Sequence, residues 1–132
     1  MRAAIIALAV LAVAGCGEAK RSMDSIDQLT RALVEAGWHD VAFHPVDTSS
    51  LSESGVTHAG MIVYGNYHWE QYQATNTATV PAVAAYFAES GLAVYTCGVL
   101  IAVVPDEKGA VSVVRKLTDL GFVPVDDASL HP

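Results

Sequence analysis

The stretch MIVYGNYHWEQYQ, residues 61–73, decides how this chain folds. It holds two runs of strand-forming residues on either side of Gly65-Asn66, a dipeptide typical of a two-residue hairpin turn with positive φ at the glycine. Such a turn fixes which residues face each other across the two strands. We therefore predict an antiparallel hairpin with the pairs Met61–Glu70, Ile62–Trp69, Val63–His68 and Tyr64–Tyr67.

The two faces of this hairpin differ, because successive residues of a strand point to opposite sides. One face carries Ile62, Trp69 and two tyrosines, and we expect it to face the core. The other face mixes apolar, charged and hydroxyl groups, and we expect it to meet water or a partner. This candidate partner surface consists of Met61, Val63, His68, Glu70 and Tyr72.

Three segments around the hairpin have apolar residues at the 3.6-residue spacing of an amphipathic helix. Each is followed by a glycine and a large apolar residue, which is typical of a helix that ends with a left-handed glycine. The predicted helices span residues 23–36, 79–90 and 107–120, and the glycine pairs are Gly37-Trp38, Gly91-Leu92 and Gly121-Phe122.

Three shorter segments, residues 40–44, 93–95 and 99–104, are predicted strands. The last is apolar at consecutive positions, as in a central strand that is covered on both faces. The order helix, strand, hairpin, helix, strand pair, helix favours a two-layer α+β fold with a mostly antiparallel sheet of about four or five strands. We expect the three helices to pack mainly on one face, and residues 23–132 to form a single domain.

Length and charge limit the function classes. A chain of 132 residues is long enough for one domain with a substantial core. Its net charge is −7, with 14 acidic against 7 basic residues. Because nucleic-acid binding relies on basic side chains, this balance argues against a nucleic-acid partner.

The N-terminal segment combines a basic start, an apolar middle and a small-small-Cys end. Arg2 precedes an uncharged run over residues 3–14, which suits a secretory signal and is shorter than the roughly 20 residues of a membrane-spanning helix. The run ends in Val13-Ala14-Gly15-Cys16, which resembles the lipobox of bacterial lipoproteins. The resemblance implies that residues 1–15 are removed as a signal peptide and that Cys16 carries a lipid. An ordinary secretory signal cleaved nearby is the alternative.

A lipidated Cys16 would hold the domain at a membrane through the short tether of residues 16–22. The resemblance thus implies a location in the cell envelope, on the extracytoplasmic side, with the membrane itself as a partner. Cys97 is then the one cysteine left, and we expect it to be a small apolar packing residue.

The domain pattern carries a second resemblance. A hairpin over residues 60–72, a helix, a strand pair over residues 95–103 and a final helix ending in Leu-Gly resemble a group of small bacterial lipoproteins of unknown function. This resemblance covers most of residues 23–132. It implies no activity, cofactor or catalytic residue.

Common catalytic and nucleotide-binding motifs are absent from the sequence, including GxSxG, HExxH, the P-loop and GxGxxG. His68-Trp69-Glu70 matches part of a zinc-deaminase motif, but the downstream PCxxC is missing. We therefore expect a non-enzymatic binding or accessory module of the envelope, without cofactor or metal. It would bind another envelope component through the candidate partner surface.

A second hypothesis is a metal-dependent or hydrolytic envelope enzyme. His68 and Glu70 lie two residues apart on one strand, so they share a face and could hold a metal or act as acid and base. His58 or His44 would supply a third ligand. The serine-rich loop beside Glu53 also leaves a serine nucleophile open, although such a loop is usually only a connection.

A third hypothesis is a small-ligand binder that uses the aromatic hairpin over residues 61–73. Four aromatic residues gather there, and aromatic side chains are favoured at recognition sites. They are equally favoured in strands because they pack well on a pleated surface. The four residues are Tyr64, Tyr67, Trp69 and Tyr72.

Overall fold

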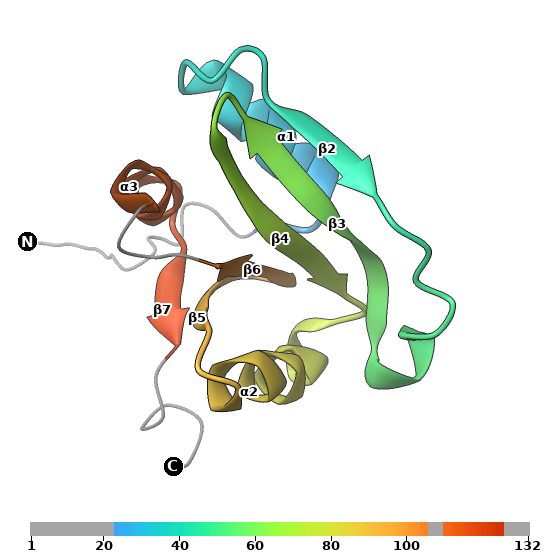
Figure 1. Cartoon of the computed structure of the whole chain (residues 1–132). Helices are drawn as coiled ribbons and strands as arrows, with labels where there is room; N and C mark the ends of the chain where they lie inside the picture. The colour runs from blue at the N-terminus through green and yellow to red at the C-terminus, as the bar shows by residue number, and fades with distance from the viewer. Residues whose placement is uncertain (1–22, 106–109, 126–132) are drawn as a thin grey trace, which may run out of the picture.

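A computed structural model describes residues 23–105 and 110–125 of the chain (Figure 1). These residues form an α+β domain built on one antiparallel sheet of six strands. The α-helices are α1 (Ile26–Glu35), α2 (Val80–Glu89) and α3 (Val111–Asp119). The strands are β2 (Ala42–Pro45), β3 (Val56–Tyr64), β4 (Tyr67–Ala74), β5 (Ala93–Cys97), β6 (Leu100–Val104) and β7 (Val123–Val125).

The predicted hairpin is confirmed as β3 and β4. Its register is the one expected from the turn, with Ile62 opposite Trp69 and Met61 opposite Glu70. Gly65 has a φ of +60°, the left-handed conformation that the turn requires. The hairpin lies inside a sheet with the order β2-β3-β4-β6-β5-β7, in which each neighbouring pair is antiparallel.

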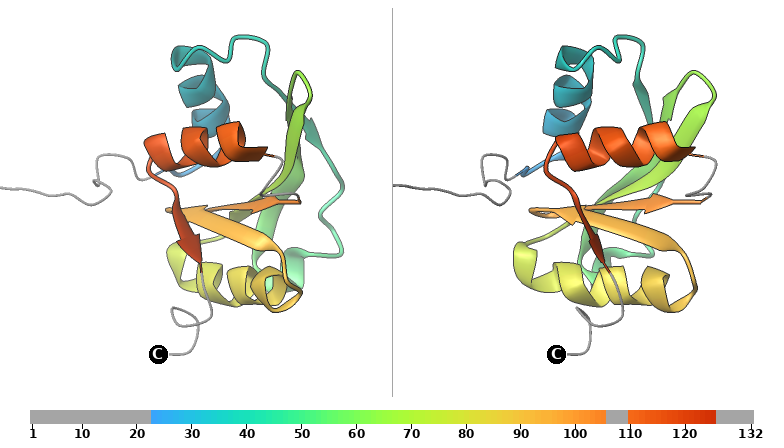
Figure 2. Two further views of the ribbon diagram at one scale, coloured as in Figure 1. Left: turned by 60° about the vertical axis from the view of Figure 1, so that its left-hand side comes forward. Right: turned by 90° about the vertical axis from the view of Figure 1, so that its left-hand side faces the viewer.

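The helices lie on both faces of the sheet (Figure 2). We call the face that packs against α1 and α3 the inner face, and the opposite face, against which α2 packs, the outer face. The prediction of two layers with the helices mainly on one face is therefore wrong for α2. The reason lies in β6, whose five residues are all buried and therefore need cover on both sides. Val83 and Ala84 of α2 belong to the cluster that supplies this cover.

The sheet also has more strands than the four or five expected. The additional strand β7 is only three residues long and pairs with β5, placing Pro124 opposite Tyr95. A proline inside a short apolar run weakens the sequence signal for a strand. Both edge strands contain a proline, since Pro45 lies at the end of β2.

The inner core is built around the fully buried Trp69 and extends to Phe122. Trp38 covers the tip of the hairpin and stacks on Tyr64, with ring centroids 4.4 Å apart and planes within 7°. The ammonium of Lys116 lies 5.7 Å from the centroid of the Trp38 ring. Trp38, in the segment after α1, thus joins the hairpin tip to Lys116 of α3.

Both ends of α1 are capped, and its C-terminal end is closed by the predicted glycine. Ser25 caps α1, because its hydroxyl oxygen accepts a hydrogen bond from the backbone N–H of Gln28 at 3.1 Å. At the other end the N–H of Trp38 donates to the carbonyl of Leu33 at 2.9 Å, with Gly37 at a φ of +105°. This is the hydrogen bond expected of a helix closed by a left-handed glycine.

Several expectations fall on residues outside the described ranges. Residues 1–15, the lipid site at Cys16 and the tether of residues 16–22 all lie there. Within the described ranges, no helix combines the length and the apolar character that crossing a membrane demands. Cys97 is buried in the inner core, as expected for a packing residue.

Candidate functional site

The five residues of the candidate partner surface lie together on the outer face. Met61 pairs with Glu70, and Val63 pairs with His68. Residues paired in this way point to the same side of the sheet. None of these side chains is buried, and α2 reaches this surface where Phe87 packs against Tyr72.

A hydrogen bond joins two members of this surface. The hydroxyl of Tyr72 donates to Oε1 of Glu70 at 2.7 Å. Burial raises the pKa of the Tyr72 phenol well above its usual range, and the hydrogen bond to Glu70 raises that pKa further. Tyr72 therefore stays neutral and holds the Glu70 carboxylate in place.

The ring of Tyr72 forms the floor of a groove that the sequence did not predict. This outer groove runs between α2 and the loop that joins β2 to β3. Its larger hollow has a volume of about 570 Å³, and a smaller hollow of about 290 Å³ lies on the other side of Tyr72. Both hollows share Leu51 and Tyr72. The larger is also lined by Glu53, Ser54, Val56, Ala82, Val83, Tyr86 and Phe87, and the smaller by Val46, Ala59, Gly60, Met61 and Glu70.

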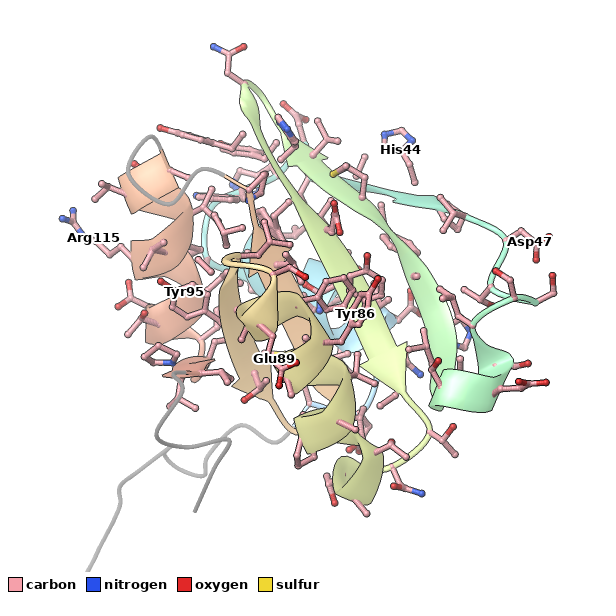
Figure 3. All side chains as sticks on the ribbon, turned by 60° about the horizontal axis from the view of Figure 1, so that its bottom comes forward. His44, Asp47, Tyr86, Glu89, Tyr95 and Arg115 are labelled. Carbon is pink, nitrogen blue, oxygen red and sulfur yellow. The ribbon has the colours of Figure 1, made fainter. Side chains whose placement is uncertain are left out.

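Helix α2 supplies one wall of the outer groove. The ring of Phe87 packs against Tyr72, with centroids 4.8 Å apart, and Tyr86 meets Phe87 edge-on at 5.1 Å. Tyr86 is 69% exposed, although it belongs to this aromatic row. Figure 3 labels Tyr86 on the side of α2 that faces the hairpin.

The loop over residues 46–55 supplies the opposite wall, and its shape depends on local hydrogen bonds. A carboxylate oxygen of Asp47, labelled in Figure 3, accepts from the backbone N–H of Ser49 at 2.9 Å. The hydroxyl of Ser52 donates to the carbonyl of Ser49 at 3.2 Å. The backbone N–H of Thr75 donates to the carbonyl of Gly55 at 2.8 Å, which ties the loop to the end of β4. The serines named in these bonds shape a turn, the role usual for such residues.

The outer groove is apolar with negative charge in each hollow. Glu53 lines the larger hollow, and Glu70 lines the smaller one. The residues that line the two hollows include no lysine, arginine or histidine. The arrangement thus offers a ligand an apolar surface, aromatic rings and hydrogen-bond acceptors.

The aromatic residues of the hairpin divide between the two faces. Tyr64 and Tyr67 stack with Trp38 on the inner side, and Trp69 is fully buried. The indole N–H of Trp69 donates to Gln71 at 2.9 Å. Tyr72 alone of the four predicted aromatic residues lines the outer groove, so the hairpin does not form one aromatic binding surface.

The predicted metal ligands lie on both sides of the sheet. His44, His68 and Glu70 are on the outer face, whereas His58 pairs with Gln73 and points to the inner side. Strand β3, which contains Met61, lies between His44 of β2 and Glu70 of β4. The ring of His58 forms a hydrogen bond with the hydroxyl of its neighbour Thr57 at 3.1 Å. Across residues 23–105 and 110–125, no group of three or more His, Cys, Asp or Glu side chains is placed to hold a metal ion.

Comparison with protein-family models, with curated proteins and with solved structures found no match to this chain.

Proposed function

We propose that this protein is a lipid-anchored binding protein of the cell envelope. In this proposal Cys16 carries the lipid, residues 16–22 form the tether, and the α+β domain stands on the extracytoplasmic side of the membrane. The domain acts as a non-enzymatic module that binds another envelope component. The lipobox-like sequence Val13-Ala14-Gly15-Cys16 supports the anchor.

The observation that carries the binding role is the outer groove. Hollows of about 570 and 290 Å³ fall in or near the size range of small-molecule sites, and their walls are mostly apolar. Three members of the candidate partner surface, Met61, Glu70 and Tyr72, line the smaller hollow. Val63 and His68 extend the same face toward the hairpin tip. The outer groove is therefore the proposed binding site, and the rest of the surface lies beside it.

The anchor is tested by expressing the full chain in a bacterial host and measuring the intact mass of the detergent-extracted protein. We expect a mass that corresponds to loss of residues 1–15 and addition of acyl lipid at Cys16. The Cys16→Ser variant should move from the membrane fraction to the soluble fraction. An unmodified thiol at Cys16, or retention of the preceding residues, would contradict the anchor.

The binding role is tested by purifying the chain from its native membranes and identifying, by mass spectrometry, the molecules that remain bound. We expect at least one component to be lost when Glu70→Lys and Tyr86→Lys are combined, because both changes place an ammonium in the outer groove. Glu35→Lys, on the exposed side of α1, is the matched control and should retain that component. If the unaltered chain, the double variant and the Glu35→Lys control all retain that component equally, the groove is not the binding site.

A further inference from the structure

We propose that the outer groove binds small amphipathic cations, molecules with an apolar body and one ammonium group. This inference rests on the proposed binding function and adds the chemical class of the ligand.

The size and walls of the outer groove suit an apolar body. The two hollows are neighbours that share Leu51 and Tyr72 in their walls. Their rims carry Tyr86 and Val46, which are 69% and 58% exposed. Large apolar side chains that gather beside a hollow are typical of a binding site. A stable interface with a protein partner buries about 800 Å² on each side. A small molecule that fits these hollows buries much less, so the hollows suit a small ligand.

The aromatic row favours a cation. Tyr72, Phe87 and Tyr86 follow one another with ring centroids 4.8 and 5.1 Å apart, and all three line the larger hollow. The face of an aromatic ring carries negative charge density and attracts an ammonium group. A quaternary or primary ammonium placed over this row would thus gain attraction from more than one ring.

The charges of the outer groove favour the same class of ligand. Glu53 lines the larger hollow and Glu70 the smaller one, and no basic side chain is among the residues that line them. Glu70 already accepts a hydrogen bond from Tyr72, but a carboxylate has about four lone-pair sites and can accept a ligand N–H as well. The net charge of −7 adds a long-range attraction for cations and repulsion for anions.

The test uses three probes that share one apolar body and differ in charge: 4-phenylbutylamine, 4-phenylbutan-1-ol and 4-phenylbutanoate. Their affinities for the full chain carrying Cys16→Ser are measured by isothermal titration calorimetry at pH 7. We expect the amine to bind about fivefold more tightly than the alcohol, and the carboxylate to bind most weakly. Combining Glu53→Gln with Glu70→Gln should bring the amine to the affinity of the alcohol. Tyr86→Ala should weaken the binding of both the amine and the alcohol. The control Glu35→Gln should leave both affinities unchanged.

The outcomes separate this inference from the proposed function. If the alcohol binds as tightly as the amine, the outer groove is a binding site but its preference for cations is wrong. If the glutamate variants leave the amine affinity unchanged, the cation lies elsewhere and the inference fails. If none of the three probes binds at millimolar concentration, the inference also fails. The native-membrane experiment then decides the proposed function independently.

Discussion

At the scale of single residues, the buried Gln71 shows how the sheet accommodates a polar side chain. It is fully buried beside Trp69 and accepts a hydrogen bond from the indole N–H of that residue. The amide nitrogen of Gln71 donates to the backbone carbonyl of Ile101 at 3.2 Å. A buried polar group is tolerated when its hydrogen bonds are made. Gln71 thereby fixes Trp69 on the inner face and leaves the next residue, Tyr72, to form the floor of the outer groove.

Two glycines with nearly the same backbone conformation give a matched prediction. Gly65 and Gly98 have φ values of +60° and +61°. A Cβ on Gly65 would meet nothing within 4 Å, whereas one on Gly98 would lie 2.5 Å from the backbone oxygen of Met23. Gly65→Ala should cost about 1–2 kcal/mol through its left-handed conformation. Gly98→Ala should cost about 1–3 kcal/mol more because the backbone of Met23 must move.

Urea denaturation of both variants measures this difference in the free energy of unfolding. Equal losses would mean that the contact between Gly98 and Met23 does not constrain the fold. A larger loss for Gly65→Ala would contradict the prediction outright.

At the scale of elements, the hairpin could be predicted almost completely, while the placement of α2 could not. The register of β3 and β4 follows from a local turn at Gly65. The choice of sheet face for α2 depends instead on which surface the other helices leave uncovered. A periodic apolar stripe predicts that a helix packs on something, but it does not say which face it covers.

The residues of the candidate site also fall into a group that the sequence could predict and a group that it could not. Glu70 and Tyr72 could be predicted as neighbours because strand alternation places them on one face. Leu51, Tyr86 and Phe87 reach the outer groove from a loop and a helix, so only tertiary packing brings them to Tyr72. The consecutive aromatic residues Tyr86 and Phe87 were a possible signal, because adjacent helix positions point about 100° apart and two large rings there are hard to bury together.

The loop wall of the outer groove should respond to pH through Asp47. The backbone N–H of Ser49 holds the pKa of this carboxyl below its usual value of 3.8, and the Ser49 side chain lowers it further. The folded-state pKa is thus lower than the unfolded one. The contribution of Asp47 to the free energy of unfolding is therefore fully present above the unfolded-state pKa. It is lost as the pH falls through the folded-state pKa.

Carboxyl carbon shifts measured by NMR across an acid titration check this prediction. We expect the midpoint of Asp47 to lie below 3.8 and the amide signal of Ser49 to shift with the same midpoint. In the Ser49→Pro variant, which lacks that N–H, the Asp47 midpoint should rise toward its usual value. A midpoint at or above 3.8 in the unaltered chain would show that the turn does not form in solution.

At the scale of the whole molecule, both edges of the sheet are short strands that contain proline. The N–H of Val46 donates to Ala59 of β3 at 2.9 Å, so the preceding residue, Pro45, has its nitrogen on the open side of β2. Pro124 is the middle residue of β7 at the opposite edge. Short edge strands with proline are a common way to prevent pairing with another sheet.

Replacing both prolines with a strand-forming residue should therefore increase self-association. We expect the Pro45→Thr, Pro124→Thr chain, with Cys16→Ser as background, to show a larger average mass than the background alone in sedimentation equilibrium. Thr48→Ser, in the loop after β2, serves as a mild control. Identical masses over a wide concentration range would contradict a protective role for the prolines.

If the chain is lipid-anchored as proposed, the two prolines have a further consequence. Copies tethered to one lipid layer meet far more often than copies diluted in three dimensions, and open strand edges under such crowding would grow into filaments. A proline at each edge removes one of the donors that such growth would need. Each copy then remains a separate unit, and its ligand-facing side stays accessible however densely the layer is populated.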